Sequence, residues 1–482
     1  MTSNSIVFYY QNCRGIRTKL HTLYMNVMSG SYDVIILTET WLTPAIYNNE
    51  FIDDRYLVFR CDRDRLATGK LEGGGVMVAV RRELRPTKML TYFQHAEIEY
   101  VVVQLPASQT NKHHIICASY IPPRTRDEVY AQYFDMLQGI LNDPVIDFFY
   151  IIGDFNLPHV DWFDQGNHTS ALATGSTSRL LLDFMSETNG MQFNNFRNKL
   201  GRILDLIISN GDCRIMSCNA LLEPDNHHPP FAFLTELSML FTPMKRQSVL
   251  RYNYNKVNYN EVNNVISKIN WDSVLTNLSS AQAVNTFYDR LYGVIRLHVP
   301  QTRTKSSHFP VWFSPNLIKI FKNKERAWLK WKRYQNMYDY EKFSNYRKLF
   351  HVEASKCFST YTNLVEDSIP KNVKYFWSYI SNRKGRSNFP SKMFFKNASS
   401  DNPSEICNLF SDYFGSVYED SKLDPENWQP CNSFSNNSTC LSNIYITEAT
   451  IKKELKSLNP SKGAGPDGIP PSFFIETRNS IY

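Results

Sequence analysis

Residues 148–156 read Phe-Phe-Tyr-Ile-Ile-Gly-Asp-Phe-Asn, an apolar run that ends in glycine, aspartate and asparagine. A strand-length run without polar residues is typical of a strand buried on both faces of a sheet. Other runs of this kind are rich in Val, Ile, Phe and Tyr, and most end near Gly, Pro, Asn or Asp. The strands predicted in this way are Ile6–Tyr10, Val34–Leu37, Gly75–Val80, Ile98–Leu105, His114–Tyr120, Asp147–Ile152, Ile203–Ser209 and Phe231–Leu237.

Helical patterns lie between several of these strands. The clearest are Arg126–Leu141 and Ser178–Thr188, and the second begins with serine and threonine, which are frequent helix caps. Strands that alternate with helices are typical of an α/β domain. We therefore predict an α/β domain with a large twisted sheet arrangement over residues 1–240.

The composition limits the class of protein. The chain has 482 residues, of which 42% are hydrophobic and 21% charged, which predicts several globular domains rather than a disordered, collagen-like or mucin-like chain. Nine scattered cysteines without a close pair at zinc spacing predict ordinary thiols. Because no signal peptide and no apolar run of membrane-spanning length is visible, we expect a soluble intracellular protein.

The character of the sequence changes after about residue 242, where helical, polar and aromatic segments replace the strands. Residues 317–350 carry ten Lys or Arg against three acids, with aromatic residues interleaved. This pattern predicts helices that bind nucleic-acid backbone, although a helix pair with buried rings and solvated lysines gives the same pattern. The candidate nucleic-acid-binding residues are Lys319, Lys322, Lys324, Lys330, Lys332 and Arg333.

Polar side chains recur where the strands of the first domain end. Asn12, Glu39 and Asp154 each follow an apolar run, and His228 lies just before another. Because strand ends line the ligand crevice in open α/β sheets, these side chains are candidates for a common site. Carboxylate and amide oxygens suit Mg²⁺, and histidine beside a carboxylate suits a general base or an electrostatic stabiliser. Each residue alone also fits a cap, a turn or a loop, so the prediction rests on the set.

The set resembles the endonuclease/exonuclease/phosphatase family, and most closely the endonuclease domain of jockey-like non-LTR retrotransposons. The resemblance covers roughly residues 6–237 and implies a four-layer α/β sandwich that hydrolyses DNA phosphodiesters with Mg²⁺, or with Mn²⁺ in its place. The motifs that carry it are Gln11-Asn12-Cys13-Arg14-Gly15, Leu37-Thr38-Glu39-Thr40-Trp41, Ser119-Tyr120-Ile121-Pro122-Pro123, Gly153-Asp154-Phe155-Asn156, Leu204-Asp205-Leu206 and His227-His228-Pro229.

The resemblance also implies a role for each motif residue. Glu39 holds the metal, with Asn12 supporting the metal and the phosphate. Asp154 activates the attacking water, and Asn156 orients the water or the phosphate. A metal and a cation then neutralise the charge that develops on the phosphoryl oxygens while a carboxylate takes a proton.

The remaining motif residues act at the phosphate. Tyr120 contacts the phosphate or steadies the leaving oxygen, and His228 faces the scissile phosphate while Asp205 orients it. One departure concerns the residue before this histidine, which is usually aspartate in the family and is His227 here. Either a local rearrangement lets Asp225 serve instead, or the affinity for metal is weaker.

The second half of the chain carries a related resemblance. Residues 458–470, Leu-Asn-Pro-Ser-Lys-Gly-Ala-Gly-Pro-Asp-Gly-Ile-Pro, resemble the opening motif of non-LTR reverse transcriptases. A helix over Thr447–Leu458 precedes this Gly/Pro loop, and an ordinary turn is the alternative interpretation. The predicted parts are the nuclease-like domain at 1–240, a helical basic and aromatic linker at 241–418, a polar loop at 419–443 and a truncated reverse-transcriptase start at 444–482.

The leading hypothesis is an endonuclease that nicks target DNA to prime reverse transcription, joined to an incomplete RNA-directed DNA polymerase. The aspartates that bind the polymerase metals in this family have no counterpart here, so we expect no polymerisation by this chain, which reads as part of a longer element protein or a truncated copy. The expected partners are target DNA and element RNA, with no membrane and no small-molecule cofactor, and the expected site of action is the nucleus after cytoplasmic synthesis. The rival hypotheses are a host apurinic-type nuclease or phosphoesterase and an inactive nucleic-acid-binding relic.

Overall fold

The chain forms two compact units, and each unit is made from two separated segments. The computed structural model describes residues 4–70, 72–91, 95–108, 111–237, 249–304, 309–384, 393–396, 398–400, 402–418 and 447–481. The first unit comprises residues 1–244 and 308–390, and the second comprises 245–307 and 391–482. The region predicted as one linker at 241–418 is therefore divided between the units, and the predicted loop at 419–443 lies outside the described residues.

Two mixed sheets make up the centre of the first unit. Among the described residues, the first sheet has six strands in the order β13 (Arg214–Met216), β14 (Phe231–Leu237), β1 (Asn4–Asn12), β2 (Val34–Thr38), β4 (Val76–Arg81) and β3 (Tyr56–Cys61). The second has eight in the order β5 (Thr87–Lys88), β6 (Glu99–Pro106), β7 (His113–Tyr120), β8 (Ile146–Asp154), β12 (Asp205–Ser209), β11 (Met191–Gln192), β10 (Thr169–Ala173) and β9 (Val160–Asp164). β1 and β2 pair in parallel, as do β7 and β8.

Alternation along the strands divides the apolar side chains between two interfaces. In β1, Phe8 and Tyr10 point into the core between the two sheets, whereas Val7 and Tyr9 point into the core outside the first sheet. This follows from the period-two geometry of a strand, which sends successive side chains to opposite faces. A strand with both faces buried must be apolar throughout, which explains why these strands could be predicted from continuous apolar runs in the sequence.

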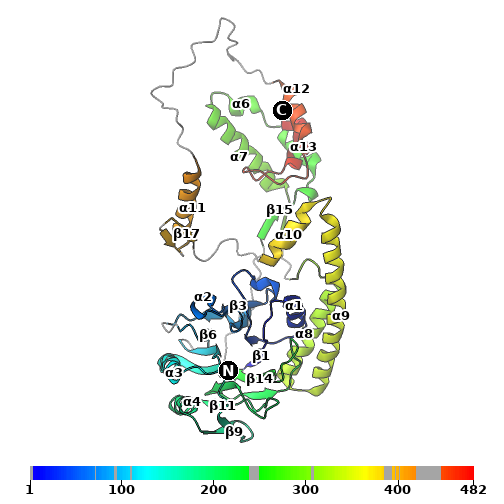
Figure 1. Cartoon of the computed structure of the whole chain (residues 1–482). Helices are drawn as coiled ribbons and strands as arrows, with labels where there is room; N and C mark the ends of the chain where they lie inside the picture. The colour runs from blue at the N-terminus through cyan, green and yellow to red at the C-terminus, as the bar shows by residue number, and fades with distance from the viewer. Residues whose placement is uncertain are drawn as a thin grey trace, which may run out of the picture. The chain divides into compact units, whose positions relative to one another are not determined.

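Helices cover the outer faces of both sheets, which gives the predicted four layers (Figure 1). α3 (Asp127–Leu141) and α4 (Ser176–Glu187) pack on the second sheet, close to the bounds predicted for them. All eight predicted strands are confirmed. The sequence reading missed β3 and the β9–β10 pair, which have partly exposed faces and therefore mixed composition. The other short elements of this unit are α2 (Arg65–Thr68), η1 (Asn48–Glu50) and η2 (Arg82–Leu84).

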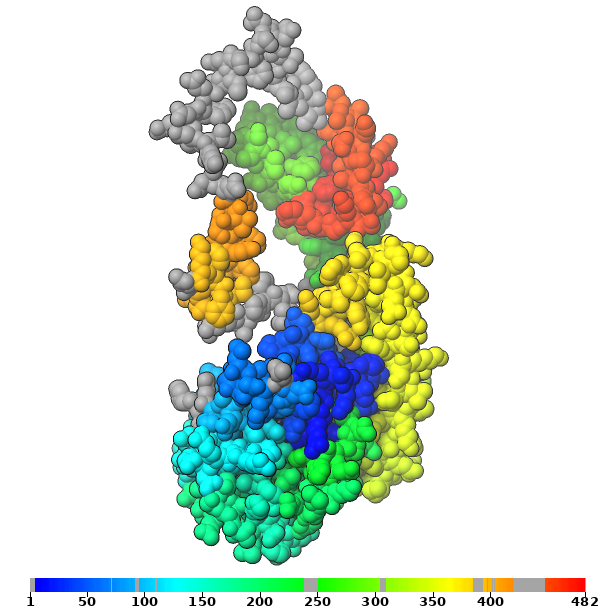
Figure 2. Space-filling view, in the orientation of Figure 1, coloured from blue at the N-terminus to red at the C-terminus, as the bar shows by residue number. Residues whose placement is uncertain are grey.

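A helical hairpin from the second chain segment completes the layer on the first sheet. α8 (Pro315–Tyr334) and α9 (Met337–Ser368) lie beside α1 (Leu20–Ser29), and α10 (Val373–Lys384) follows them. Trp328, Trp331 and Phe343 are buried in one apolar cluster with Tyr9 and Leu37 of the sheet. Figure 2 shows α9 in yellow along the edge of this unit, beside the dark blue N-terminal segments. The hairpin is therefore part of the same fold as the sheets.

The second unit has a small core of its own. Val262, Ile266, Leu291 and Ile295 surround Phe473, which follows the Gly/Pro loop. The predicted helix at Thr447–Leu458 is confirmed as α12. The elements are β15 (Val249–Tyr252), η3 (Tyr254–Lys256), α5 (Tyr259–Ile266), α6 (Trp271–Leu275), α7 (Ser280–His298), β16 (Gln301–Thr304), β17 (Met393–Phe395), β18 (Ala398–Ser400), α11 (Pro403–Val417), α12 (Glu448–Ser457) and α13 (Pro471–Ile481). None of the helices in the described part of the chain is both long and apolar enough to cross a membrane.

Candidate active site

Five candidate side chains meet at one end of the two sheets. Asn12 ends β1 and Glu39 follows β2, and the parallel register that pairs Asn12 with Thr38 brings them together. Asp154 ends β8 and pairs in register with Asp205 at the start of β12. His228 stands before β14, which is the other neighbour of β1. Strand order and register thus bring together residues that are far apart in sequence.

Asn12 links the two carboxylates of the site. Its Nδ2 donates hydrogen bonds to Glu39 Oε1 at 3.1 Å and to Asp154 Oδ2 at 3.0 Å. Asn12 and Asp154 are almost completely buried, whereas Glu39 is partly exposed. The amide therefore holds two acids close together and leaves one of them open to a ligand.

His228 contacts the buried Asp205, which is itself held by Tyr10. Its Nδ1 lies 3.0 Å from Asp205 Oδ2 and 3.7 Å from Asp154 Oδ2. The other oxygen of Asp205 accepts a hydrogen bond of 2.6 Å from the Tyr10 hydroxyl, which also lies 2.8 Å from the Thr38 hydroxyl. Sequence reasoning missed Tyr10, although Tyr10 and Asn12 share one face of β1 through the period-two spacing.

The electrostatics of this cluster follow from burial and proximity. Burial opposes a charge on His228, but Asp205 and Asp154 outweigh it and raise the pKa of the imidazole to about 9. Burial and the neighbouring charge of Asp205 raise the pKa of Asp154 well above its usual value. At neutral pH the site therefore presents an imidazolium beside a carboxyl group with increased proton affinity.

Two of the loops that carry site residues have unusual backbone conformations. Glu39 and Asn156 have φ values of 50° and 49°, which are left-handed and uncommon for residues other than glycine. The Asn156 amide N–H donates to Asp154 Oδ1 at 3.1 Å, and its Nδ2 donates to the Ile121 carbonyl at 2.8 Å. Such conformations persist where surrounding contacts hold them, and they concentrate at functional sites.

Gly153 lets the two central strands of the second sheet approach closely just before Asp154. A Cβ atom at this position would lie 1.9 Å from the Ser119 carbonyl oxygen of β7. Because no side chain fits there, glycine is required on steric grounds. The close approach fixes the position of the backbone at the end of β8, from which the Asp154 side chain projects.

Tyr120 lies at the edge of the same cluster. It is 6% exposed, and burial together with Glu39 and Asp154 raises the pKa of its hydroxyl. The Arg63 guanidinium lies 5.6 Å from the ring centre and forms an ion pair of 2.5 Å with Glu99, the register partner of Tyr120. Sequence reasoning missed Arg63 and Glu99, because isolated charges in a sequence carry no signal of pairing.

The loop before β14 contains Asp225, the residue that could stand in for the aspartate usual at the position of His227. Asp225 forms an ion pair with Arg14 at 2.9 Å, and its carboxylate also accepts from the His227 backbone N–H at 2.6 Å. In the described part of the chain, the cluster of potential metal ligands comprises Glu39, Asp154 and His228. Asp225 thus closes the turn and does not join the cluster.

The donor set fits a hard divalent cation. Glu39, Asp154 and His228 each offer one ligand atom, and these atoms lie within 4.8 Å of one another. Carboxylate oxygens are the ligands that Mg²⁺ and Mn²⁺ favour, whereas His228 Nδ1 already faces Asp205. The two carboxylates are therefore the residues best suited to hold such an ion.

Comparison with known proteins agrees with this geometry. Residues 10–233 match the profile of the Endonuclease/Exonuclease/phosphatase family. This part of the chain has the endonuclease/exonuclease/phosphatase fold. No curated protein sequence matches the chain.

Solved structures of this fold resemble the chain over about half its length. The endonuclease domain of TRAS1, a telomere-specific non-LTR retrotransposon, is 13% identical, with a TM-score of 0.34, over 49% of this chain and 100% of its own. An AP endonuclease from Archaeoglobus fulgidus is 15% identical, with a TM-score of 0.33, over 48% of this chain and 99% of its own. The catalytic domain of APE2 from Xenopus laevis is 16% identical, with a TM-score of 0.33, over 48% of this chain and 93% of its own.

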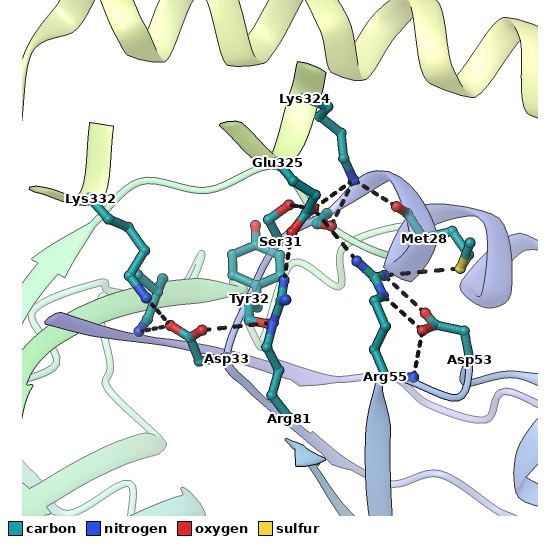
Figure 3. Close-up of polar contacts among 12 residues, drawn as sticks. Met28, Ser31, Tyr32, Asp33, Asp53, Arg55, Arg81, Lys324, Glu325 and Lys332 are labelled. Carbon is teal, nitrogen blue, oxygen red and sulfur yellow. Dashed lines mark hydrogen bonds and ion pairs between the residues drawn. The ribbon is translucent and has the colours of Figure 1, made fainter. Parts of the chain in front are cut away.

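The basic residues of α8 separate into two groups on this fold. Lys319, Lys322, Lys330 and Arg333 are exposed, as binding of a nucleic acid requires. Figure 3 shows that Lys324 and Lys332 instead point at the endonuclease/exonuclease/phosphatase fold. Lys324 is fully buried and Lys332 is paired with Asp33, so neither can contact nucleic acid while the hairpin is docked. The prediction for these two lysines is wrong because both lie toward the side of α8 that packs on the sheet.

Proposed function

We propose that the chain is a metal-dependent phosphodiesterase that nicks DNA, of the kind encoded by non-LTR retrotransposons. The observation that carries this proposal is the convergence of Glu39, Asp154 and His228 at one end of the two sheets, linked by Asn12 and backed by Asp205. Two acids and a charged imidazole in one cluster suit the hydrolysis of a phosphodiester.

In the proposed reaction, the Asp154 carboxylate accepts a proton from the attacking water, and Asn156 orients that water or the phosphate. Glu39 would hold a divalent cation such as Mg²⁺ or Mn²⁺, with Asn12 in support. When bound, this ion supplies positive charge against the phosphoryl oxygens. His228, held by Asp205, faces the same oxygens with a second positive charge, and the Tyr120 hydroxyl contacts the phosphate or the leaving oxygen. The bond between the water oxygen and phosphorus forms as the bond between phosphorus and the 3′ oxygen breaks. The 3′ oxygen takes a proton from solvent, so the nicked strand carries a 3′-hydroxyl and a 5′-phosphate.

The retrotransposon origin is the finer part of this proposal. It rests on the resemblance of residues 458–470 to the opening motif of a non-LTR reverse transcriptase and on the motifs of the first domain. A nick with a free 3′-hydroxyl serves as a primer, so the proposed substrate is chromosomal DNA, reached in the nucleus after synthesis in the cytoplasm. The proposed template is the RNA of the element.

Nicking of supercoiled plasmid by the full chain tests the proposal. We expect open-circular product with Mg²⁺ or Mn²⁺ and none with EDTA. D154N should lower the rate by roughly 10²–10⁴-fold, the usual contribution of a positioned acid–base group. The matched control is D161N, which neutralises an exposed aspartate on β9 and should leave the rate unchanged.

Two other outcomes would replace the proposal. Cleavage only of duplexes that contain an abasic site would favour an apurinic-type repair nuclease. Absence of cleavage with every DNA and metal tested, in a chain that is folded, would favour a relic that only binds nucleic acid.

A further inference from the structure

Helix α8 is seated on the nuclease-like fold by a buried lysine. Lys324 Nζ donates hydrogen bonds to the carbonyls of Met28, Ser29 and Gly30 at 2.8, 3.0 and 3.1 Å. These carbonyls form the C-terminal end of α1 and have no partner within that helix, so a cation there is favourable. Three acceptors match the three hydrogens of an ammonium group. The contact fixes the rotation of α8 about its own axis.

Two other charged side chains of α8, Glu325 and Lys332, also point toward the nuclease-like fold (Figure 3). Glu325 accepts a hydrogen bond of 2.6 Å from Ser31 and faces Arg81 at 3.5 Å and Arg55 at 3.7 Å. Lys332 pairs with Asp33 at 2.6 Å. Glu325 is the single acid of α8. Because it faces the fold, the outward face of the helix carries no negative charge.

Five cations lie along that outward face, at Lys319, Lys322, Arg326, Lys330 and Arg333. Their spacing of three or four residues places them on one side of a helix, over a length of about 21 Å at 1.5 Å per residue. All five are exposed, and none forms an ion pair with an acid among the described residues. The opposite side of α8, with Leu317, Trp328 and Trp331, is buried. We call these five residues the outer basic row.

Two exposed tyrosines flank the turn between α8 and α9: Tyr334 is the last residue of α8, and Tyr338 lies in the first turn of α9. Tyr334 is 64% exposed and Tyr338 is 59% exposed. The Arg333 guanidinium lies 5.5 Å from the Tyr334 ring centre, and Lys342 Nζ lies 4.2 Å from that of Tyr338. Exposed rings beside cations suit stacking on nucleobases.

We propose that the outer basic row and the two tyrosines bind single-stranded nucleic acid, with the cations on the phosphates and the rings on unpaired bases. This contact is separate from the candidate active site and does not depend on the nuclease activity proposed above. A membrane surface is a poorer partner, because insertion needs a free apolar face and that of α8 is buried. A duplex fits less well because its bases are stacked inside and cannot reach the tyrosines.

The test measures binding of a labelled 20-nucleotide oligouridylate to the full chain by fluorescence anisotropy, in EDTA and at several salt concentrations. A variant with Lys319, Lys322, Arg326, Lys330 and Arg333 all changed to glutamine should bind at least tenfold more weakly at 0.1 M salt. Its salt slope should fall by roughly 3, since each lost phosphate contact on a single strand contributes about 0.7. Y334A and Y338A should each weaken binding about tenfold and leave the slope unchanged.

The matched control changes five other exposed lysines of α9, α10 and the turn between them, at positions 348, 356, 371, 374 and 384, to glutamine. Both quintuple variants lose the same net charge, so a difference between them isolates the geometry of the row. Equal losses of affinity in the two variants would overturn the proposal. Equal affinity for a duplex of the same length, with no effect of the tyrosine changes, would also overturn it.

Discussion

At the scale of single residues, the candidate site depends on a chain of buried hydrogen bonds behind His228. Tyr10 donates to Asp205, and Asp205 holds the imidazole. We expect D205N to lower the nicking rate by roughly 10²–10⁴-fold, because a misoriented or neutral imidazole no longer faces the phosphate as a cation. Y10F keeps the carboxylate and removes one of its donors, so a loss of about tenfold is expected. Plasmid nicking under single-turnover conditions measures both.

Y150F is the matched control for Y10F. Tyr150 lies in the same core between the sheets, and its hydroxyl is bonded to Thr235 at 2.9 Å. Y150F removes the same hydroxyl group from the same apolar core, at the middle of β8 and not beside Asp205. If Y150F and Y10F reduce the rate equally, the effect of Tyr10 comes from packing and the positioning role is wrong.

Part of this site could be predicted from the sequence, because several of its residues lie at strand ends. Glu39, Asp154 and His228 each adjoin an apolar run, so their convergence could be expected from fold geometry. Tyr10 could not be assigned a role, because a tyrosine inside an apolar strand indicates core packing as readily as a hydrogen bond. The role of Asp225 also depended on a contact with Arg14, more than 200 residues away in sequence.

At the scale of elements, α8 shows that a sequence pattern can predict a helix without predicting which of its lysines are buried. Leu317, Lys324 and Trp331 are spaced seven residues apart and therefore lie on one side of the helix, which is the buried side. That spacing was visible in the sequence. The composition of the segment nevertheless favoured six cations in one role, because burial of a lysine requires acceptors that α1 supplies from elsewhere in the chain.

The docking of α8 should respond to acid through Glu325. Burial raises the pKa of this carboxyl, but Arg81, Lys324 and Arg55 outweigh it and lower the pKa to about 2, from an ordinary value of 4.5. A lowered pKa stabilises the folded state above pH 4.5, and that contribution is lost as the pH falls toward 2. We expect E325Q to be less stable than the wild type by roughly 2 kcal/mol at pH 7, with a difference that shrinks steadily between pH 5 and pH 3.

Thermal unfolding of the full chain at pH 7, 5, 4 and 3 measures this difference. E341Q is the control, because Glu341 is exposed on α9 and forms no ion pair within the described residues. Its unfolding temperature should follow the wild type at every pH. A deficit in E325Q that stays constant down to pH 3 would show that the carboxylate charge does not stabilise the docked helix.

At the scale of the whole molecule, the change in composition after residue 242 lies close to residue 244, where the first segment of the first unit ends, but it did not predict that residues 308–390 return to that unit. The composition of a segment depends on how much of its surface is exposed to water. α8 and α9 are polar because most of their surface faces water. Their narrow apolar side nevertheless covers the first sheet. Contacts between residues near position 30 and residues near 325 are not encoded in any local pattern. The four layers were predictable from the strands, whereas the origin of one helical layer was not.

From this arrangement we expect the hairpin to stabilise the nuclease-like fold. A fragment that ends at residue 240, the boundary suggested by composition, leaves the surface under Trp328, Trp331 and Phe343 open to water. We expect that fragment to unfold at a lower temperature than the full chain and to bind a hydrophobic dye.

In the full chain, W328A and W331A together should reproduce the effect, because each truncation of a buried tryptophan costs about 3–5 kcal/mol. The control pair L329A and L349A removes exposed leucines from the same hairpin and should change neither measurement. A fragment as stable as the full chain would mean that the hairpin rests on the first sheet without stabilising it.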